Sequence, residues 1–485
     1  MKMLIGGKKV DAISKKTMDN INPATYEIID TVPEAGEEDI ELAIQNAVKG
    51  QKEWNDIPFH KRMDILENFI NLLDKNKEKV AEMMCLEGGK PIGQALGEVG
   101  RVRDGFHSYM AQARTMFGKT LPFNSESRGE GDILFTVYEP IGPIACICAF
   151  NFPGVLFSHK VGAALCSGNA AIIKPASDTP GATMMMTELL IEAGVPGNTI
   201  QCITGKGSFV GNKLVEDERI KGVSLTGSTA VGLKLAEICA KQLKPCSLEL
   251  GGNDPFVICK DADIDEAVSL TLGGRIANAG QICCSSKRIL VHDSIKTQFV
   301  EKLKKALENM KIGDPKDPAT EIGPVINNRA AEEIVSQIEL SVSEGATLVT
   351  GGKRVFPLGE NKGNFISPAI LDNVPKNSSV ATDTEVFGPC FAVIGFETID
   401  EAIEISNNSK YGLSSGILTY NMKDAFRFAT KVDAGACVIG YNGNYRLCQQ
   451  PFNGHKYSGV GSEGSLYTMQ EFLKVKTIVL KNMLS

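Results

Sequence analysis

The sequence predicts an α/β protein whose core is a Rossmann-like, doubly wound parallel sheet. Between residues 141 and 251, short and almost wholly apolar segments alternate with segments of helical pattern. Strands of this kind, separated by helices, form a parallel sheet that is covered on both faces. Right-handed crossovers between successive strands then produce the doubly wound arrangement. A second series of strands and helices after residue 252 predicts a second α/β domain.

The N-terminal part predicts an antiparallel edge piece followed by helices. Over residues 61–84 apolar side chains recur at the spacing of one helix face, namely at Met63, Leu66, Phe69, Ile70 and Leu73. A further helix is predicted over residues 98–117, with Gly118 as its stop signal. Residues 132–139, closed by Pro140, then predict an exposed hairpin strand.

The parallel sheet is expected to contain five strands, at residues 144–149, 170–173, 200–204, 222–225 and 246–250. Helices are predicted between them at residues 154–166, 180–193, 208–216 and 228–242. The second of these helices carries clear boundary signals. Thr179 is the expected N-cap, Pro180 suits the first turn, and Gly194 ends the helix.

The second domain is expected to contain strands at residues 256–258, 288–292, 346–350 and 391–396. The C-terminal residues 472–480 alternate in polarity like a strand. This tail is able to pair with the hairpin strand at 132–139, either in its own chain or in a neighbouring one. Because two detached strands are too few to be stable alone, a dimer built by strand pairing is a reasonable hypothesis.

Composition excludes several classes of protein. The 485 residues include 51 basic and 58 acidic side chains, a net charge of −7, so neither a nucleic-acid surface nor an anionic-membrane surface is expected. No apolar run reaches the roughly 18 residues that a membrane span requires, and no secretory signal is recognisable. The 13 cysteines follow no metal-site or disulfide spacing, so we expect no metal site and a reducing, cytoplasmic location.

Two segments of the first domain have the character of a nucleotide site. Residues 226–232 read Thr-Gly-Ser-Thr-Ala-Val-Gly and open a predicted helix, where Gly227 allows a tight turn and free N–H groups attract a phosphate. A glycine turn without a ligand is the alternative. Lys174, at the end of a predicted strand, is able to reach a ribose or phosphate, although most lysines simply lie at the surface.

Glu249 lies at the end of an otherwise apolar strand. A carboxylate in such a place is costly unless it is paired or takes part in chemistry. Burial would raise its pKa and suit it to act as a general base near neutral pH. The alternative is a glutamate that caps a helix or forms a salt bridge.

Cys283 and Cys284 lie in a turn of small residues before a predicted strand. A cysteine in such a turn can serve as an exposed nucleophile, and it can equally be an ordinary buried thiol. Adjacent cysteines rarely form a disulfide without strain, so the pair is interpreted as a nucleophile and a pocket wall.

Six motifs in one order carry a resemblance that extends from about residue 20 to the C-terminus. The motifs lie at residues 149–153, 248–252, 280–283, 385–389, 411–416 and 451–459. With these motifs the chain resembles the aldehyde dehydrogenase superfamily, and in particular its lactaldehyde, semialdehyde and non-phosphorylating glyceraldehyde-3-phosphate members.

The resemblance implies oxidation of an aldehyde to a carboxylic acid. The cysteine that matches the family's nucleophile is Cys283, and the oxyanion is held by the Asn151 side chain and the Cys283 N–H. Glu249 matches the general base that hydrolyses the thioester after hydride transfer to the cofactor. The alternatives are a CoA-acylating dehydrogenase, whose members generally lack this glutamate, and a nucleotide-binding protein without turnover.

The resemblance also implies a cofactor site. Ser177 stands where NAD-selective members often carry a glutamate, which would repel a 2′-phosphate, whereas Lys174 would attract one. NADP is therefore the expected cofactor, with NAD as the alternative. The implied cofactor-binding residues are Phe150, Lys174, Ser177, Gly207, Gly227, Ser228, Leu250, Glu385 and Phe387.

The substrate is less closely defined. Succinate-semialdehyde members tend to carry arginines at the positions of His159 and Ala277, so the usual anchors of a dicarboxylic semialdehyde are absent here. Arg101 and Arg446 remain as candidate anchors for a substrate anion, and each can also be a purely structural arginine. Phe452 is expected to line the substrate tunnel, where an aromatic wall favours an apolar or short aldehyde.

The implied architecture divides the chain into three parts. A cofactor-binding domain comprises residues 1–120 and 141–251, and a catalytic domain comprises residues 252–465. A small β oligomerisation element comprises residues 121–140 and 466–485. The resemblance implies a homo-oligomer, either a dimer or a tetramer, that acts on a small-molecule aldehyde.

Overall fold

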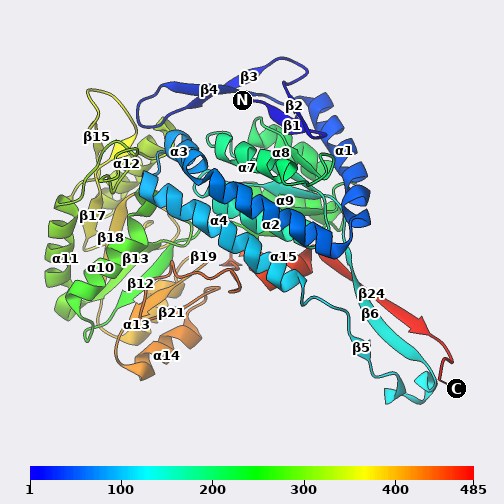
Figure 1. Ribbon diagram of the computed structural model, residues 1–485. Coiled ribbons are helices and arrows are strands. Elements are labelled where there is room, and N and C mark those ends of the chain that lie inside the picture. Colours follow the sequence, from blue (N-terminus) through cyan, green and yellow to red (C-terminus); the bar gives the residue numbers. More distant parts are fainter. Residues whose placement is uncertain (485) are drawn as a thin grey trace.

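The computed structural model describes residues 1–484 and contains two large sheets, one in each half of the molecule (Figure 1). The first sheet has the strand order β2-β1-β9-β8-β7-β10-β11-β23. Its five central strands are parallel to one another and almost wholly buried, and they confirm the predicted doubly wound sheet. They are β7 (Ile144–Ile147), β8 (Ala171–Lys174), β9 (Ile200–Cys202), β10 (Gly222–Thr226) and β11 (Cys246–Glu249).

Antiparallel strands close both edges of this sheet. One edge is formed by β1 (Met3–Ile5) with β2 (Lys8–Val10), and the other by β23 (Gly459–Val460). Because β23 pairs with β11, the sheet brings a segment near the C-terminus beside the strand that ends at Glu249. A separate hairpin is formed by β3 (Thr17–Ile21) and β4 (Ile28–Pro33).

Helices connect the parallel strands largely as the sequence predicts. The segment expected at 154–166 is helical throughout but contains a π turn: α5 (Pro153–Phe157), η3 (Ser158–Gly162) and α6 (Ala163–Cys166). Such wide turns often occur at functional sites. The other helices of this part are α1 (Glu37–Asp56), α7 (Gly181–Glu192), α8 (Gly207–Glu216) and α9 (Thr229–Lys241).

The helices before the sheet correct two sequence predictions. The single helix expected over 61–84 is two helices, α2 (Phe59–Lys75) and α3 (Lys77–Gly88), because Asn76 leaves the helical conformation at φ −110° and ψ 13°. The helix expected over 98–117 is α4 (Ile92–Ala113). It begins immediately after Pro91, and near its end the Thr115 hydroxyl donates to the Gln112 carbonyl and competes with the helical hydrogen bonds.

The predicted N-cap of α7 is also wrong. The Thr179 hydroxyl donates to the Phe150 carbonyl at 3.4 Å, and Pro180 occupies the cap position. The free N–H groups of Gly181 and Ala182 instead donate to the buried carboxylate of Glu87, at 2.7 and 2.9 Å. A capping group that is supplied from another helix cannot be recognised from the local sequence.

The second sheet has the order β14-β17-β18-β13-β12-β20-β21 and is parallel except for β14. Each of the four predicted strands is present within it. The strands are β12 (Asp254–Ile258), β13 (Ser286–His292), β14 (Thr347–Thr350), β17 (Ala369–Asp372), β18 (Cys390–Phe396), β20 (Gly416–Leu418) and β21 (Val438–Ile439). The surrounding helices are α10 (Ile264–Arg275), α11 (Asp293–Glu308), α12 (Asn328–Ser343), α13 (Ile399–Asn407) and α14 (Met422–Lys431).

Two strands form an arm that projects from the body of the molecule (Figure 1). The predicted hairpin strand is β6 (Ile133–Pro140), and it pairs along its whole length with β24 (Leu473–Leu480) of the same chain. β5 (Thr120–Leu121) extends this sheet, and α15 (Ser465–Glu471) leads into β24. Apolar side chains on the arm, such as Val475 and Val479, remain largely exposed.

Shorter pairs complete the chain: β15 (Arg354–Val355) with β16 (Phe365–Ile366), and β19 (Tyr411–Gly412) with β22 (His455–Lys456). Among residues 1–484, the helices are all too short or too polar to cross a membrane.

We expect replacement of Glu87 by alanine to destabilise the fold. The variant would leave the N–H groups of Gly181 and Ala182 buried without an acceptor, and each such donor costs about 1–3 kcal/mol. The free energy of unfolding should therefore fall by about 2–4 kcal/mol, measured as a lower thermal midpoint. Glu82→Ala, at an exposed position of the same helix, is the matched control. Equal midpoints for the two variants would contradict this account of the cap.

Candidate active site

A cleft of about 550 Å³ lies at the carboxyl ends of the parallel strands of the first sheet. It also receives Cys283, which precedes β13, Glu385, which precedes β18, and residues of α12, so both halves of the molecule form its walls. Ligands of doubly wound sheets bind at this edge. The cleft brings together Asn151, Cys283 and every residue expected to bind the cofactor: Phe150, Lys174, Ser177, Gly207, Gly227, Ser228, Leu250, Glu385 and Phe387.

The end of the cleft at which a nucleotide is expected is polar. Ser228 is the N-cap of α9, and its hydroxyl accepts a hydrogen bond from the Val231 N–H at 3.4 Å. The Lys174 ammonium donates to the Ser177 hydroxyl at 3.3 Å, and burial lowers the pKa of Lys174 to about 8. Thr226 contributes a buried hydroxyl that has no partner among the described residues. A helix N-terminus, a buried lysine and an unpaired hydroxyl fit a phosphate or a ribose.

A strained turn presents Cys283 to the cleft. Three consecutive residues, Asn278, Ala279 and Gly280, have left-handed backbones with φ of +52°, +53° and +78°. For residues other than glycine this conformation costs roughly 1–2 kcal/mol each, so the surroundings must maintain it. The buried Arg275 guanidinium does so by donating to the Gly280 carbonyl and the Ser285 hydroxyl, at 2.7 and 2.8 Å.

The Asn151 loop is attached to the same turn. The Asn151 side-chain amide donates to the Gln281 carbonyl at 3.1 Å, and the Asn151 carbonyl accepts from Asn278 and Lys90. An amide nitrogen carries two donors, so one N–H of Asn151 remains for a ligand. Within residues 1–484, the backbone N–H of Cys283 also has no protein acceptor. Two N–H donors beside one thiol form a potential oxyanion site.

The interaction with the adjacent Cys284 thiol, together with burial, holds the pKa of Cys283 well above its usual range. The positive charges of Lys287 and Arg446 act in the opposite direction. Cys284 packs in a buried apolar cluster with Phe452, Ile282 and Leu413.

Glu249 is buried at the end of β11, with 3% of its surface exposed. Neither carboxyl oxygen has a hydrogen-bond partner among the described residues, so Glu249 caps no helix and pairs with no cation there. Burial raises its pKa well above the usual value, and the negative charge of Glu463 raises it further. The structure therefore favours the interpretation of Glu249 as a group held ready for chemistry.

A buried charge cluster beside Glu249 was not recognised in the sequence. The Glu463 carboxylate accepts hydrogen bonds from Lys160 at 3.0 Å, Arg446 at 2.9 Å and His159 at 2.9 Å. Burial opposes its ionisation, but these partners outweigh burial and hold the pKa of Glu463 well below its usual range. The available signal was Lys160, a charged residue in a helix that is otherwise almost wholly apolar.

Aromatic rings form the wall next to the thiol. The Arg446 guanidinium carbon lies 3.8 Å from the centre of the Phe452 ring, and Phe452 belongs to the apolar cluster around Cys283. Arg101 lies 5.6 Å from the ring centre of Phe152 in the same way, but its side chain is exposed. Both predicted arginines thus stack on aromatic rings of this region, and Arg446 is the one that also joins the buried charge cluster.

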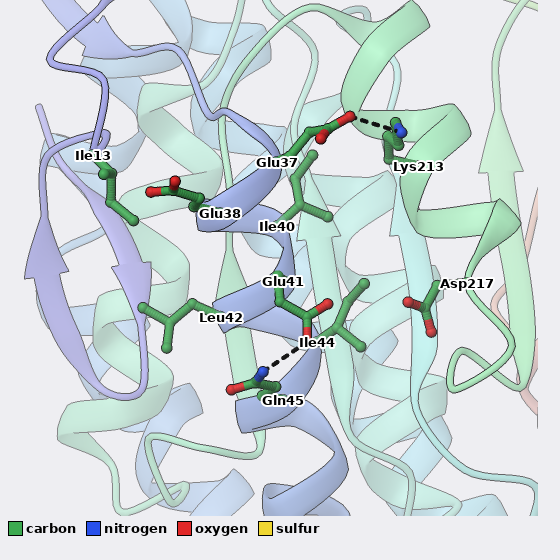
Figure 2. A pocket seen from close by; sticks show the side chains of 10 residues that line it. All are labelled: Ile13, Glu37, Glu38, Ile40, Glu41, Leu42, Ile44, Gln45, Lys213 and Asp217. Carbon is green, nitrogen blue, oxygen red and sulfur yellow. Dashed lines mark hydrogen bonds and ion pairs between the residues drawn. The ribbon is translucent and has the colours of Figure 1, made fainter.

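A second hollow, of about 600 Å³, lies against the outer face of α1 (Figure 2). Two of its acidic groups have partners within the hollow: Glu37 pairs with Lys213 at 2.8 Å, and Glu41 accepts from Gln45. None of the predicted site residues lies there, so the chemistry belongs to the cleft between the sheets.

Comparison with known proteins agrees with the geometry. The model of the family described as "Aldehyde dehydrogenase family" matches residues 10–478. The glutarate-semialdehyde dehydrogenase of Pseudomonas putida is 35% identical over 98% of this chain and 97% of its own. The succinate-semialdehyde dehydrogenase of Escherichia coli, named with NADP, is 35% identical over 98% and 96%.

Solved structures are similar along the same length. An Escherichia coli enzyme described as NADP dependent has a TM-score of 0.94 and 34% identity, with 99% of this chain and 98% of that chain covered. An NAD+ complex of the aldehyde dehydrogenase from Bacillus cereus has a TM-score of 0.94 and 32% identity, with 99% and 96% covered. The chain therefore belongs to the aldehyde dehydrogenase family. It is an oxidoreductase that converts aldehydes to carboxylic acids, as its sequence motifs predicted.

The two buried glutamates predict opposite effects of pH on stability. The pKa of Glu249 in the folded state lies above the ordinary 4.5, so its ionisation opposes folding. The free energy of unfolding therefore falls as pH rises from 4.5 toward the folded-state pKa. The folded pKa of Glu463 lies below 4.5, so its ionised form contributes stability above that pH. The thermal midpoint of Glu249→Gln should therefore rise relative to wild type between pH 5 and 8.

Glu463→Gln is the matched opposite case. At pH 7 it should lower the unfolding free energy by about 3–5 kcal/mol, because it leaves buried cations without their carboxylate. Between pH 5 and 8 the Glu463→Gln curve should run below the wild-type curve and parallel to it, because Glu463 is ionised throughout that range and its pH-dependent contribution lies below pH 4.5. A Glu249→Gln curve that also ran parallel to wild type would show that the raised pKa of Glu249 is wrong.

Proposed function

We propose that Cys283 is the nucleophile of this aldehyde dehydrogenase, with Asn151 and Glu249 as its catalytic partners. One arrangement carries the proposal: a half-buried thiol and two N–H donors lie at one cleft, and the unpaired carboxyl group of Glu249 ends the strand directly before Leu250, which lines that cleft. The thiol attacks the aldehyde carbon after losing its proton, and the carbonyl oxygen gains negative charge. The free N–H of the Asn151 amide and the Cys283 N–H then stabilise that charge.

The cofactor is NADP or NAD, which when bound would supply the acceptor for the hydride of the substrate carbon. The chain's own residues prepare its site. Ser228 and the N-terminus of α9 would hold the pyrophosphate, Lys174 and Ser177 would hold the adenine ribose, and Glu385 would hold the second ribose. Phe150 and Phe387, whose ring centres are 6.0 Å apart, flank the neighbouring part of the cleft, and Gly207, Gly227 and Leu250 allow close backbone contact.

Glu249 is proposed to act in the second half of the reaction. The acyl group is then a thioester on Cys283, and water must attack its carbon. A buried carboxyl with a raised pKa is a suitable base near neutral pH, because its ionised form is strongly basic. The Cys283 thiolate leaves, and the carboxylic acid is released. Because a base that activates water leads to hydrolysis of the thioester, Glu249 supports release of the acid over transfer of the acyl group to coenzyme A.

The net positive charge near Cys283 supports a substrate that carries a polar group at the end opposite its aldehyde. The positive charges of Lys160 and Arg446 surround the single carboxylate Glu463, while burial lowers the pKa of His159 and favours its neutral form. A net positive charge therefore remains near the aromatic wall of Phe452. We propose that Arg446 binds a carboxylate or hydroxyl group of a short aldehyde, with Arg101 as a second contact at the tunnel mouth.

The chain is proposed to work as a homo-oligomer, either a dimer or a tetramer. The part at residues 121–140 and 466–485 would be the oligomerisation element, because apolar side chains of its exposed strands, such as Val475 and Val479, lack cover; Ser485 lies outside the described residues. Residues 1–120 with 141–251 would form the cofactor-binding domain, and residues 252–465 the catalytic domain. All thirteen cysteines are free thiols, which supports a reducing, cytoplasmic location.

The first test replaces Cys283 by serine. We expect cofactor reduction with an aldehyde to fall by at least about 10³, because a serine hydroxyl is a far weaker nucleophile at pH 7. Cys437→Ser, at another half-buried thiol, is the matched control and should retain wild-type turnover. Wild-type turnover by Cys283→Ser would refute the assignment. An absolute requirement of the wild-type enzyme for coenzyme A would refute the role of Glu249.

The second test concerns cofactor choice. Ser177→Glu should weaken NADP binding and shift preference toward NAD, because the new carboxylate repels a 2′-phosphate. Ser177→Ala is the control without charge and should keep the preference for NADP. Dissociation constants measured by fluorescence titration give the result, and unchanged NADP affinity in Ser177→Glu would count against this account.

The third test compares succinate semialdehyde with butanal, which has the same carbon chain without the carboxylate. In Arg446→Met the KM for the semialdehyde should rise about tenfold or more relative to the KM for butanal, because a charge-assisted hydrogen bond is lost. Arg103→Met, on the exposed face of α4, is the control and should not change the ratio. An unchanged ratio in Arg446→Met would exclude this arginine as the anchor.

A further inference from the structure

Lys287 is a buried lysine that contacts residues 278–283, the turn that carries Cys283 and that we call the nucleophile turn. It is the second residue of β13, and its side chain is 2% exposed. The Lys287 ammonium donates to the carbonyl oxygens of Ile282 and Cys283, at 2.9 and 2.5 Å. It also forms an ion pair at 3.2 Å with Glu385, which lines the cleft. A single cation therefore touches both the nucleophile turn and the carboxylate expected at the cofactor ribose.

The other charged groups near Lys287 leave Glu385 as its principal ionic partner. Asp254, on the neighbouring strand β12, is fully buried, and burial raises its pKa to about 8, so it is mainly neutral at pH 7. Arg288, the next residue, points to backbone carbonyl groups and pairs with no carboxylate. Around Cys283 the remaining charged or titratable groups are Cys284, Glu249 and Arg446.

Arg275 joins the same two segments without an ionic link. Its guanidinium donates to Gly280 and Ser285 on one side and to the carbonyls of Val386 and Cys390 on the other. This arginine has only neutral acceptors, so it fixes the backbone. Lys287 differs because its charge is shared between a carboxylate and the vicinity of the thiol.

We propose that Lys287 is a positioning residue that couples the nucleophile turn to Glu385. The charge and position of the Glu385 carboxylate then influence the reactivity of Cys283. The proposal rests on the function assigned above to Cys283 and Glu385. By holding the carbonyls of Ile282 and Cys283, Lys287 leaves the Cys283 N–H directed to the oxyanion. The positive charge of Lys287 stabilises the Cys283 thiolate, and the negative charge of Glu385 partly cancels that stabilisation.

This coupling predicts opposite changes in two variants. Lys287→Met removes the cation, so the thiolate becomes harder to form. Glu385→Gln removes the competing carboxylate and leaves the whole charge of Lys287 to the thiolate. An opposite charge within a few ångströms typically shifts a pKa by one unit or more, so we expect the alkylation midpoint of Cys283 to rise by about one pH unit in the first variant. In the second variant it should fall.

The experiment measures the rate of iodoacetamide alkylation at Cys283 between pH 6 and 10, without cofactor, by mass spectrometry of the peptide with fragment localisation. At pH 7.5 the rate should fall about tenfold in Lys287→Met and should rise in Glu385→Gln. Lys287→Arg keeps the charge and should restore most of the wild-type profile.

Lys244→Met is the matched control for the loss of a buried lysine. Lys244 also donates to two backbone carbonyls, those of Val215 and Asp217, but lies away from the cleft. Its alkylation profile should equal that of wild type. A profile unchanged in Lys287→Met or in Glu385→Gln overturns the proposal, and if Lys287→Met does not fold, Glu385→Gln decides alone. Turnover is not measured here, so a failure of the proposed reaction would be seen separately, in Cys283→Ser.

Discussion

The catalytic region depends on one buried carboxylate, Glu463, which must stay ionised inside the protein. Lys160 and His159 from the π turn and Arg446 from the C-terminal part all converge on it. Isolated charges of this kind are very costly to bury, so each member is retained only because the others are present. As a consequence, the nearby cations Lys160 and Arg446 pair with Glu463. Glu249 is left unpaired, and its pKa is raised by burial and by the neighbouring negative charge.

A second constraint acts on the backbone of the nucleophile turn. Asn278 and Ala279 occupy left-handed conformations that are unfavourable for residues with a side chain. Hydrogen bonds from buried cations hold the turn in this shape, and the same cations reach the segment that carries Glu385. The geometry of the thiol is thus tied to the wall of the cofactor cleft. Strain at a functional site is maintained by the packing of both halves of the molecule.

The sequence predicted the two α/β sheets because both signals are local. Strands that are buried on both faces are short and apolar, and the helices between them carry their own periodicity. Local signals failed where distant residues intervene. Thr179 has the right residue type for a cap, yet Glu87, a neighbour only in three dimensions, satisfies the free N–H groups of α7. The break at Asn76 divides a helix whose apolar periodicity continues across it.

By itself the sequence determined the family, the fold class and the expected cofactor residues that line the cleft with Asn151 and Cys283, because motif order and residue type can be read without coordinates. Only the tertiary structure decided the protonation states. Glu249 and Glu463 are the same amino acid, and nothing in the local sequence distinguishes their acidity. Burial without partners raises the pKa of the first, and three converging nitrogen donors lower that of the second. Electrostatic energies depend on distance and solvent access, which are fixed only when segments far apart in the chain are packed together.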